Sequence, residues 1–404
     1  MIKSEPDYQE IFSFVGREMR PNAIRKMTAL LGRGDVISLS AGAPSHETFP
    51  LEELSEIAAQ VIRERGRFAL QYGPTRGQSQ LVQQVADIMR GRGVENASPS
   101  NVVLTTGSQQ GLDLISRVIL DPGDIALVEL PSYVGGTIAL HNARAELVGV
   151  RQDEGGIVIG DLLEKLEAAR RDGRRVKCLY TIPNFQNPSG VTLSGERRRE
   201  LVDIADEHDL LLIEDDAYYE LYFTGASERF ETLAALRPSR AVYLSSFSKV
   251  LAPGLRAAWL CAPEEIASKV ELAKEGADLS SSLLDQSIVS EALRSGLVER
   301  RLPEIRGFYR TRCRAMLEAL ERCAPAGATW TSPLGGFFIL MKLASGVDAT
   351  KVLPDAIEAG VAYVPGQPFF VDNSGTNTLR LAYSKESPEA IKDGIERLCR
   401  VLSR

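Results

Sequence analysis

Residues 245–256 read Ser-Ser-Phe-Ser-Lys-Val-Leu-Ala-Pro-Gly-Leu-Arg and join a predicted strand at 241–245 to another at 256–261. The stretch puts the Lys249 amine beside the hydroxyls of Ser246 and Ser248, with Arg256 seven residues further on. Hydroxyls and a planar guanidinium are donors that suit a bound phosphate. A lysine is most often a solvated surface residue, so the interpretation of this stretch as a site depends on the segments around it.

The segments on either side predict a mostly parallel sheet. Short apolar runs alternate with helical patterns, and runs that are apolar throughout are typical of strands covered by helices on both faces. The strand at 256–261 should run antiparallel, because only a short connection precedes it. The remaining strands of this sheet are expected at 102–106, 125–129, 177–181, 210–214 and 241–245.

The pattern becomes mainly helical after Pro263. We expect a long helix from there to about Arg294, and the chain before Leu51 is expected to pack on the C-terminal unit. The predicted domains are a large one at 51–293 and a small one formed by 1–50 and 294–404. The C-terminal elements are expected to be a helix at 300–322, strands near 336–343, 361–364 and 378–382, and a last helix at 388–402.

Composition and charge limit the classes of function. A formal charge of −7 disfavours nucleic acid or an anionic membrane as a partner. No apolar run reaches the ~18 residues that a membrane helix needs. The three histidines and five cysteines are dispersed, so no metal site is expected. Scattered cysteines and a polar N-terminus favour a cytoplasmic protein with reduced thiols.

Polar residues gather where the predicted strands end, which is where open parallel sheets bind ligands. Gly107 and Ser108 open a helix after one strand, so its first amides could hold a phosphate, although a plain helix cap fits equally. Asp215 and Asp216 end another strand. One of the two carboxylates should enter the interior, where it needs a cationic partner. A solvated acidic loop is the alternative.

Three further residues fit the same ligand. Asn187 lies in a turn marked by Asn-Pro and Ser-Gly pairs, and Tyr133 follows a strand and could stack on a flat ring. Arg380 is a charge within a β-favouring run. A substrate carboxylate bound through two N–H groups would explain it, as would an edge strand that faces water. These segments lie far apart in the chain, and one shared ligand explains all of them.

As a set, the motifs resemble those of the aspartate aminotransferase superfamily, the fold-type-I class I and II aminotransferases that use pyridoxal 5′-phosphate (PLP). The resemblance depends on the Ser-x-Ser-Lys stretch with its downstream arginine, the Asn-Pro-x-Gly turn and the Asp215–Tyr218 pair, and it extends over essentially the whole chain. The branch that contains the 2-aminoadipate and kynurenine aminotransferases is the most similar. The runs that indicate this branch are 39–44, 70–75, 276–279 and 364–366.

The resemblance implies a large domain with a mostly parallel seven-stranded sheet sandwiched by helices, a small α+β domain, and a homodimer with shared active sites. Lys249 would carry PLP as a Schiff base, and Asp215 would keep the pyridine nitrogen protonated. Tyr133 would stack on the ring as a third catalytic residue. The other implied contacts are Asn187 and Tyr218 with the ring hydroxyl, and Ser108, Gln109, Ser246, Ser248 and Arg256 with the phosphate, joined by Tyr72 of the neighbouring subunit.

The implied reaction is transamination by a ping-pong mechanism. An L-amino acid (2-aminoadipate, glutamate, aromatic or branched-chain) would give its amino group to the cofactor, and a 2-oxo acid such as 2-oxoglutarate would take it away. Lys249 would move the proton between Cα and C4′. Gly42, Arg380 and Asn187 would bind the α-carboxylate.

The identity of the substrate stays open. Arg25 would bind the distal carboxylate of glutamate or 2-aminoadipate, although it also fits a solvated position on an amphipathic helix. The runs Ala41-Gly42-Ala43 and Ser280-Ser281-Ser282 depart from relatives on the expected substrate side.

Two alternatives to a transaminase remain. A PLP-dependent lyase or cyclase would use the same core residues, and product analysis would separate the two. An effector-sensing regulator with an aminotransferase-like domain would need a DNA reader ahead of that domain, whereas only about 40 residues precede Gly42. An enzyme is therefore expected.

Overall fold

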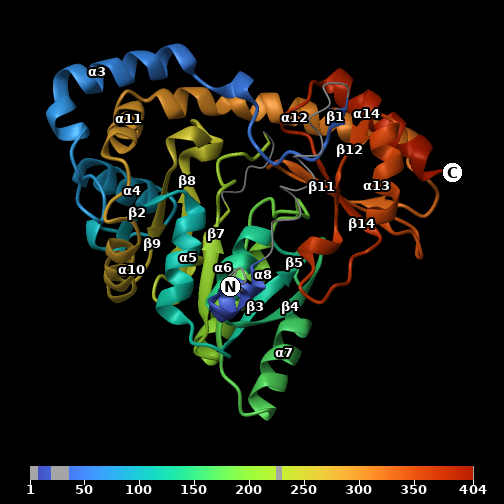
Figure 1. Cartoon of the computed structure of the whole chain (residues 1–404), viewed down its shortest axis with the longest axis horizontal. Helices are drawn as coiled ribbons and strands as arrows, with labels where there is room; N and C mark the ends of the chain where they lie inside the picture. The colour runs from blue at the N-terminus through green and yellow to red at the C-terminus, as the bar shows by residue number, and fades with distance from the viewer. Residues whose placement is uncertain (1–7, 20–35, 224–229, 404) are drawn as a thin grey trace, which may run out of the picture.

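The computed structural model describes residues 8–19, 36–223 and 230–403. Within these residues the main feature is an eight-stranded sheet (Figure 1). The neighbouring strands β4, β3, β6, β7 and β8 run parallel to one another, whereas β9 is antiparallel to both β8 and β2. In spatial order the strands are β2 (Val102–Thr106), β9 (Ala257–Cys261), β8 (Ala241–Ser246), β7 (Leu211–Asp215), β6 (Val176–Thr181), β3 (Ile125–Leu130), β4 (Glu146–Asp153) and β5 (Gly156–Ile157).

This sheet confirms the predicted fold class. The antiparallel strand before Cys261 is where the sequence placed it, and β4 is a strand that the sequence pattern did not indicate. Seven strands form the mostly parallel sheet, and the two-residue β5 adds a short antiparallel edge to β4 among the described residues.

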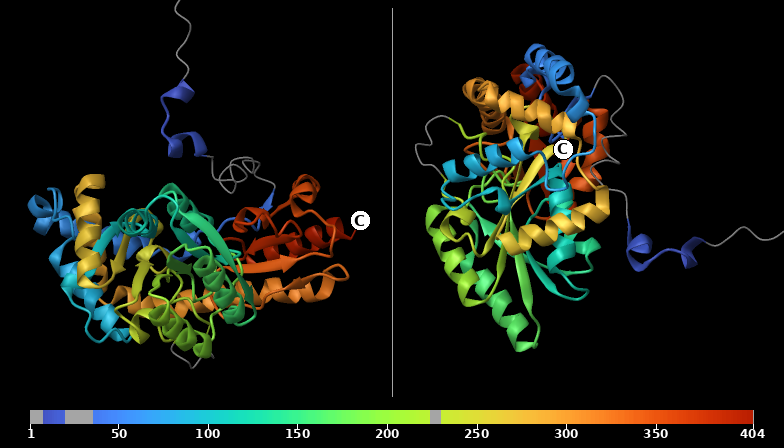
Figure 2. Two further views of the ribbon diagram at one scale, coloured as in Figure 1. Left: turned by 90° about the horizontal axis from the view of Figure 1, so that it is seen from below. Right: turned by 90° about the vertical axis from the view of Figure 1, so that its left-hand side faces the viewer.

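Alternate residues along the strands fill two hydrophobic cores, one on each face of the sheet. Val103 and Tyr180 belong to the core that α5, α6 and α10 cover, whereas Leu104 and Leu179 belong to the core under α4, α7, α8 and α11. Figure 2 shows the helices on both sides of the strands. The helices of this unit are α3 (Leu51–Ala69), α4 (Ser79–Gly91), α5 (Ser108–Ile119), α6 (Val134–Asn142), α7 (Ile159–Arg171), α8 (Gly195–Glu207) and α9 (Leu233–Leu236).

The predicted long helix from Pro263 to Arg294 is wrong. The structure has two helices there, α10 (Glu264–Asp278) and α11 (Leu283–Arg294). Leu279 has a φ of 61°, which no right-handed helix continues through, and the Ser282 side chain caps α11 by accepting a hydrogen bond from its backbone. The break turns Asp278 and Ser281 toward the Thr106 hydroxyl, just before α5 begins.

The C-terminal part forms a second unit with its own core. Its four-stranded sheet has the order β10-β11-β14-β13 among the described residues. As predicted, the chain before Leu51 packs here, because β1 pairs in parallel with β12. The elements are β1 (Ile37–Ser38), β10 (Thr329–Trp330), β11 (Phe338–Lys342), α13 (Ala349–Glu358), β12 (Val361–Ala362), β13 (Val364–Pro365), β14 (Thr378–Ala382) and α14 (Pro388–Leu402).

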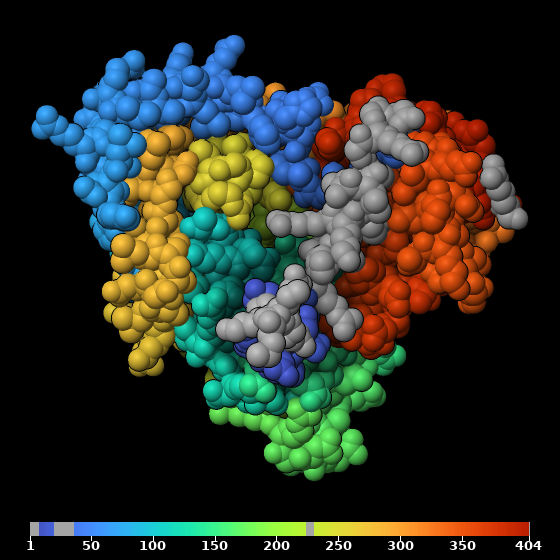
Figure 3. Space-filling model, viewed as in Figure 1, coloured from blue at the N-terminus to red at the C-terminus, as the bar shows by residue number. Residues whose placement is uncertain are grey.

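Helix α12 (Leu297–Cys323) joins the two units. Ile305 and Tyr309 lie in the core of the first unit, and Met316 and Leu320 lie in that of the second. Figure 3 shows the second unit in orange and red beside the larger body. The domain boundary near residue 293 stays a prediction.

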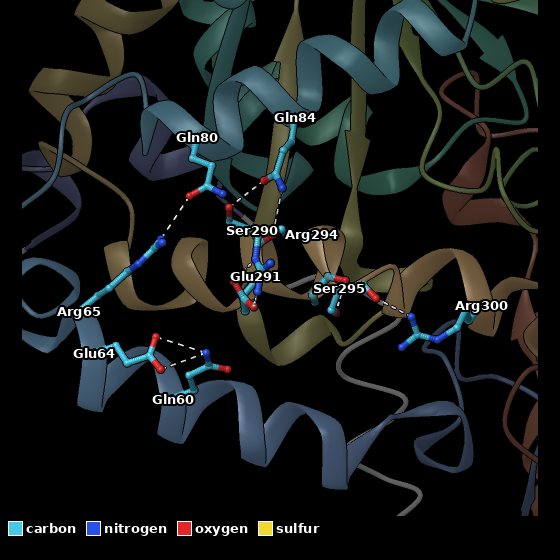
Figure 4. A network of polar contacts seen from close by, with 11 residues as sticks. Gln60, Glu64, Arg65, Gln80, Gln84, Ser290, Glu291, Arg294, Ser295 and Arg300 are labelled. Carbon is cyan, nitrogen blue, oxygen red and sulfur yellow. Dashed lines mark hydrogen bonds and ion pairs between the residues drawn. The ribbon is translucent and has the colours of Figure 1, made fainter.

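Polar contacts hold α3, α4 and α11 together at the far end of the larger unit (Figure 4). Arg65 donates to Gln80 Oε1 at 3.2 Å, and the Ser290 hydroxyl donates to Gln84 Oε1 at 2.7 Å. Ahead of this body lies the short helix α1 (Phe14–Glu18), whose Phe14 ring faces the Arg144 guanidinium at 4.7 Å. None of the described helices combines the length and the apolar composition that a membrane span requires.

Candidate active site

Four parallel strands bring predicted site residues to one edge of the large sheet. Tyr133 follows β3, Asn187 follows β6, and Asp215 is the last residue of β7. These three strands and β8 are parallel neighbours, so their carboxyl ends meet at one edge. The β8 strand ends at Ser246 and leads directly to the short 3-10 helix Phe247–Lys249.

The proposed phosphate residues meet around the start of β9. Ala257 pairs with Thr106 on one side and Ala258 pairs with Ser246 on the other, which brings the first turn of α5 close to the serine pair. The Ser246 hydroxyl donates to Ser248 Oγ at 2.7 Å. The guanidinium of Arg256 lies against Gly107, where a Cβ atom would overlap it.

Gly107 and Arg256 both have special backbone conformations at this end of the site. Gly107 is the N-cap of α5 and has a φ of 82°, which favours glycine. Arg256 has a φ of 49° and donates from Nη2 to the Thr106 carbonyl at 3.3 Å. The helix N-terminus, two hydroxyls and a guanidinium therefore form a cradle that suits a phosphate. Ser108 is the first residue of α5, and Gln109 donates to the Gly135 carbonyl at 2.7 Å.

Lys249 and Asp215 are buried next to each other. Burial lowers the pKa of Lys249 to about 8, while the Asp215 charge acts in the opposite direction. Burial raises the pKa of Asp215 to about 6, against a hydrogen bond from Tyr180 that lowers it. An amine whose pKa lies near neutrality is suited to nucleophilic attack and to proton transfer.

Both carboxylates of the acidic pair are buried, whereas the sequence predicted one. Asp215 and Asp216 are 5% and 0% exposed. Asp216 accepts hydrogen bonds from Asn184 and Tyr243 and lies near the cations of Arg92 and Arg198. The protein thus supplies counter-charges for Asp216 from α4 and α8, regions that the local sequence around residue 216 does not indicate.

Asp215 lacks equivalent neighbours. Its Oδ2 atom accepts a hydrogen bond from the Tyr180 hydroxyl at 2.8 Å. Its Oδ1 atom is buried and has no hydrogen-bond partner within the described part of the chain. The Oδ1 atom of Asp216 lacks a partner there as well, but two arginine cations act on that acid. The cation that acts on Asp215 is Lys249. A buried acceptor without a donor is costly, so Asp215 Oδ1 calls for an N–H group from a bound molecule.

Arg380 is a buried cation with a free donor, whereas Asp215 is a buried acid with a free acceptor. The arginine lies in β14 between β11 and β13, not in an edge strand, and is 3% exposed. It donates to Asn187 Oδ1 at 3.0 Å and to the Ser40 carbonyl at 2.8 Å. Its Nε atom has no acceptor, and no carboxylate pairs with it, among the described residues. Burial lowers its pKa to about 10. A carboxylate from a ligand would satisfy both its charge and its free donor.

Three more predicted residues surround Arg380 and Lys249. Gly42 lies close to the Phe338 ring: a Cβ atom added at residue 42 would lie 2.8 Å from Phe338 Cζ and 3.8 Å from Arg380 Nη1. Asn187 also forms a hydrogen bond with the Tyr218 hydroxyl. The Lys249 amine lies 5.8 Å from the centre of the Tyr218 ring. Tyr133 is the N-cap of α6, and its hydroxyl faces Gln109 Oε1 at 3.5 Å.

Tyr72 is not part of this cluster. It lies on the surface, 79% exposed, and its predicted role belongs to a neighbouring subunit's site. Arg25 lies outside the described residues.

The sequence missed several residues that support the site. Tyr180 holds Asp215, and the buried carboxylate of Glu129 accepts hydrogen bonds from Thr181 and Gln186. Gln186 in turn accepts a hydrogen bond from the Ser189 backbone, which orders the turn around Asn187. Strand alternation could have found Tyr180, because a tyrosine in an apolar run near a strand end shares a face with every second neighbour.

These residues fit PLP. Asp215 Oδ1 offers an acceptor for a protonated pyridine nitrogen, and the cradle at Gly107 offers donors for a phosphate. Tyr218 and Asn187 lie where they can reach a ring hydroxyl, and Lys249 provides the amine. The unsatisfied Arg380 is then left for a substrate carboxylate.

Known proteins resemble this chain in sequence and in fold. Residues 34–398 match the family model for aminotransferase class I and II. The chain is 41% identical over 397 residues to the 2-aminoadipate transaminase of Thermus thermophilus, with 98% of this chain and 97% of the relative covered. It is 39% identical over 397 residues to aromatic-amino-acid aminotransferase 1 of Thermococcus litoralis, at 98% and 95% coverage. The crystal structure of Pyrococcus horikoshii kynurenine aminotransferase in complex with PMP superimposes with a TM-score of 0.94, at 39% identity and 98% coverage of both chains.

Proposed function

The chain belongs to the class I and II aminotransferase family and is a PLP-dependent transaminase of amino acids and 2-oxo acids; we propose that its donors include 2-aminoadipate and glutamate and that 2-oxoglutarate is its acceptor. The observation that supports binding of a substrate is the buried guanidinium of Arg380, which has no carboxylate partner among the described residues and lies beside Asn187, in a cluster that also holds Lys249 and Asp215. A cation that is shielded from water in this way favours binding of the carboxylate that amino acids and 2-oxo acids share. The 41% identity to a 2-aminoadipate transaminase supports the acidic donors.

When bound, PLP supplies a carbonyl that reacts with amines and a protonated ring that accepts the electron pair left at Cα. The protein's part in the reaction begins with orientation. Arg380 and Asn187 bind the α-carboxylate, and Gly42 allows the backbone to pack against Phe338 beside Arg380 without a collision. These contacts fix the substrate's Cα relative to Lys249. The Cα–H bond can then be broken with little further loss of the substrate's translational and rotational entropy.

Lys249 performs the proton transfer. Its amine, with a pKa of about 8, takes the proton from the substrate's Cα and returns one at the cofactor carbon C4′. Asp215 stays ionised at neutral pH because its pKa of about 6 lies below it, so its carboxylate can hold a positive ring nitrogen. Release of the first oxo acid before the second one binds gives the ping-pong order.

The working unit is a homodimer with shared active sites. The surface position of Tyr72, together with the exposed Leu70 and Phe68 that precede it, supports contact with a second copy of the chain. We keep the domain division at 51–293 against 1–50 with 294–404. The cytoplasm is the proposed location, which suits the five free cysteines found among the described residues.

Replacement of Lys249 by Ala tests the proposed proton transfer. The variant should still bind PLP, and its turnover should fall by at least about 10³-fold because the group that moves the proton is gone. Added methylamine should restore part of the rate, since it supplies an amine to the space that the side chain leaves. Turnover near that of the wild-type enzyme would contradict the assignment of Lys249.

A panel of donors tests the proposed substrate class. Arg25→Gln should lower kcat/KM for 2-aminoadipate and glutamate by about 10- to 100-fold, the usual effect of losing a charged hydrogen bond. Leucine lacks a distal carboxylate and serves as the matched control, with kcat/KM expected to stay within twofold. Equal losses for glutamate and leucine would remove Arg25 from the substrate site.

A further inference from the structure

Tyr180 is a buried hydroxyl that the proposed mechanism does not use. It lies in β6 and pairs in register with Ile213 of β7. Because alternate residues share a face, Tyr180 lies on the same face of the sheet as Asp215, two residues beyond Ile213. Its hydroxyl donates to Asp215 Oδ2 at 2.8 Å.

The ring of Tyr180 is fixed by its surroundings. It is 0% exposed and belongs to the core under α5 and α6. Gly136 of α6 lies directly against it, so closely that a Cβ atom at residue 136 would overlap the ring. A phenol held on all sides directs its O–H bond along one line, toward the carboxylate.

This hydrogen bond decides how Asp215 faces the site. One oxygen of the carboxylate is bound to the tyrosine, and the other, Oδ1, is buried without a partner among the residues that the structure describes. The bond also favours the ionised carboxylate against the effect of burial. The other charged groups that act on Asp215 are Asp216 and Lys249.

We propose that Tyr180 is a positioning residue that holds Asp215 so that its free oxygen meets the ring nitrogen of the cofactor. The inference rests on the proposed function and extends it to a residue that touches neither the cofactor nor the substrate. Tyr180 contributes to cofactor binding only through Asp215, so its effect on affinity is expected only for a ligand that has the ring nitrogen.

The adjacent pair of Asp216 and Tyr243 provides a matched control. The Tyr243 hydroxyl donates to Asp216 Oδ2 at 3.1 Å and accepts a hydrogen bond from Arg92 at 2.6 Å. It is equally buried but belongs to the core on the opposite face of the sheet. Loss of this hydroxyl should affect stability and leave the cofactor contact unchanged.

The experiment measures the affinity of the full-length apo-protein for two ligands by calorimetric titration. One is pyridoxamine phosphate, which binds without a covalent bond to lysine, and the other is its analogue with C–H in place of the ring nitrogen. Tyr180→Phe should weaken binding of pyridoxamine phosphate about tenfold and leave binding of the carbon analogue within twofold. Tyr243→Phe should leave both affinities within twofold of wild type.

The outcomes separate the inference from the function it rests on. Unchanged affinity of Tyr180→Phe for pyridoxamine phosphate overturns the positioning role, as does an equal loss for both ligands. Thermal unfolding of each apo-variant shows whether it is folded, and a folded Tyr180→Phe keeps the comparison valid. Wild-type protein that binds the two ligands equally tightly would instead refute the pairing of Asp215 with the ring nitrogen, and with it the proposed function of Asp215.

Discussion

Asp215 and Asp216 are adjacent acids in equally dry surroundings, and their neighbours give them different tasks. Asp216 has Arg92 and Arg198 nearby, whereas Asp215 has the amine of Lys249 and a tyrosine hydroxyl. A buried charge that the protein already neutralises is structural, and one that it leaves partly unmet is available to a ligand. The contacts of the two acids therefore support the proposal that Asp215 is the one that meets the cofactor.

Neutralisation of Asp215 should stabilise the apo-protein at pH 8. The folded-state pKa of Asp215 is about 6 against an ordinary value of 3.8, so above pH 6 the folded state bears the cost of a buried charge. Asp215→Asn should therefore raise the free energy of unfolding, by up to about 3 kcal/mol. Burial also raises the pKa of Asp216, despite the nearby cations of Arg92 and Arg198, so the sign of the effect does not distinguish the two acids.

Urea unfolding at two pH values checks this prediction. The gain from Asp215→Asn should shrink as the pH falls from 6 toward 4, where wild-type Asp215 becomes protonated in both states and its cost disappears. A loss of stability for Asp215→Asn at pH 8, or a gain that does not depend on pH, would contradict the assignment.

The sequence predicted the residues that carry charge or hydroxyl groups at strand ends, because such residues are exceptions to apolar runs. It did not predict that both acids are buried, since the compensating cations of Arg92 and Arg198 come from distant helices. It also missed Tyr180: strand alternation indicates the face on which this residue lies, but its contact with Asp215 follows from the register between β6 and β7.

At the scale of elements, the start of α5 is the critical junction of the site. Gly107 joins β2 to α5 at a φ of 82° and lies against Arg256, while Asp278 and Ser281 support Thr106 from the break between α10 and α11. The break that helical periodicity failed to indicate therefore contributes to the cradle. Helical periodicity did not indicate the break because residues 279–282, a leucine and three serines, include no glycine or proline, the residues that usually mark an interruption.

Gly107→Ala should disturb this junction. The added methyl group requires a strained backbone and overlaps the Arg256 guanidinium, so the free energy of unfolding should fall by about 1–3 kcal/mol. Affinity for pyridoxamine phosphate should fall more than affinity for pyridoxamine, which has no phosphate. The measurements are urea unfolding and calorimetric titration of the apo-protein.

Gly195→Ala is the control for this experiment. Gly195 is the first residue of α8, and a methyl group there meets nothing within 4 Å, so stability should change by less than about 0.5 kcal/mol. Equal losses for pyridoxamine and pyridoxamine phosphate in Gly107→Ala would show that the junction does not hold the phosphate.

At the scale of the molecule, two cores joined by α12 place Arg380, the proposed carboxylate-binding residue, on one unit and Lys249 on the other. The second unit was predictable because the sequence pattern after Pro263 becomes mainly helical and its strands follow separately from those of the parallel sheet. The proposed dimer adds a further level, since Tyr72 is expected to complete the site of a second copy.

Mixed dimers test that sharing. Lys249→Ala and Tyr72→Ala homodimers should both be impaired, one through the amine and one through the phosphate contact. A heterodimer of the two has one site with a native lysine and a native tyrosine from the other subunit, so activity should reappear when the two proteins are unfolded together and refolded. Absence of any recovery would place Tyr72 in its own subunit's site or outside both.

The central claim is that the Lys249 site carries PLP and accepts amino groups from amino acids. Its most direct test is the absorbance spectrum of the PLP-loaded enzyme before and after addition of 2-aminoadipate, with no oxo acid present and with glutamate as a second donor. We expect the long-wavelength band of the bound cofactor to be replaced by the band of pyridoxamine phosphate in the near ultraviolet. Addition of 2-oxoglutarate should restore the long-wavelength band. An unchanged spectrum with both donors would contradict the acidic substrate class, and an unchanged spectrum with aromatic and branched-chain donors as well would contradict transamination.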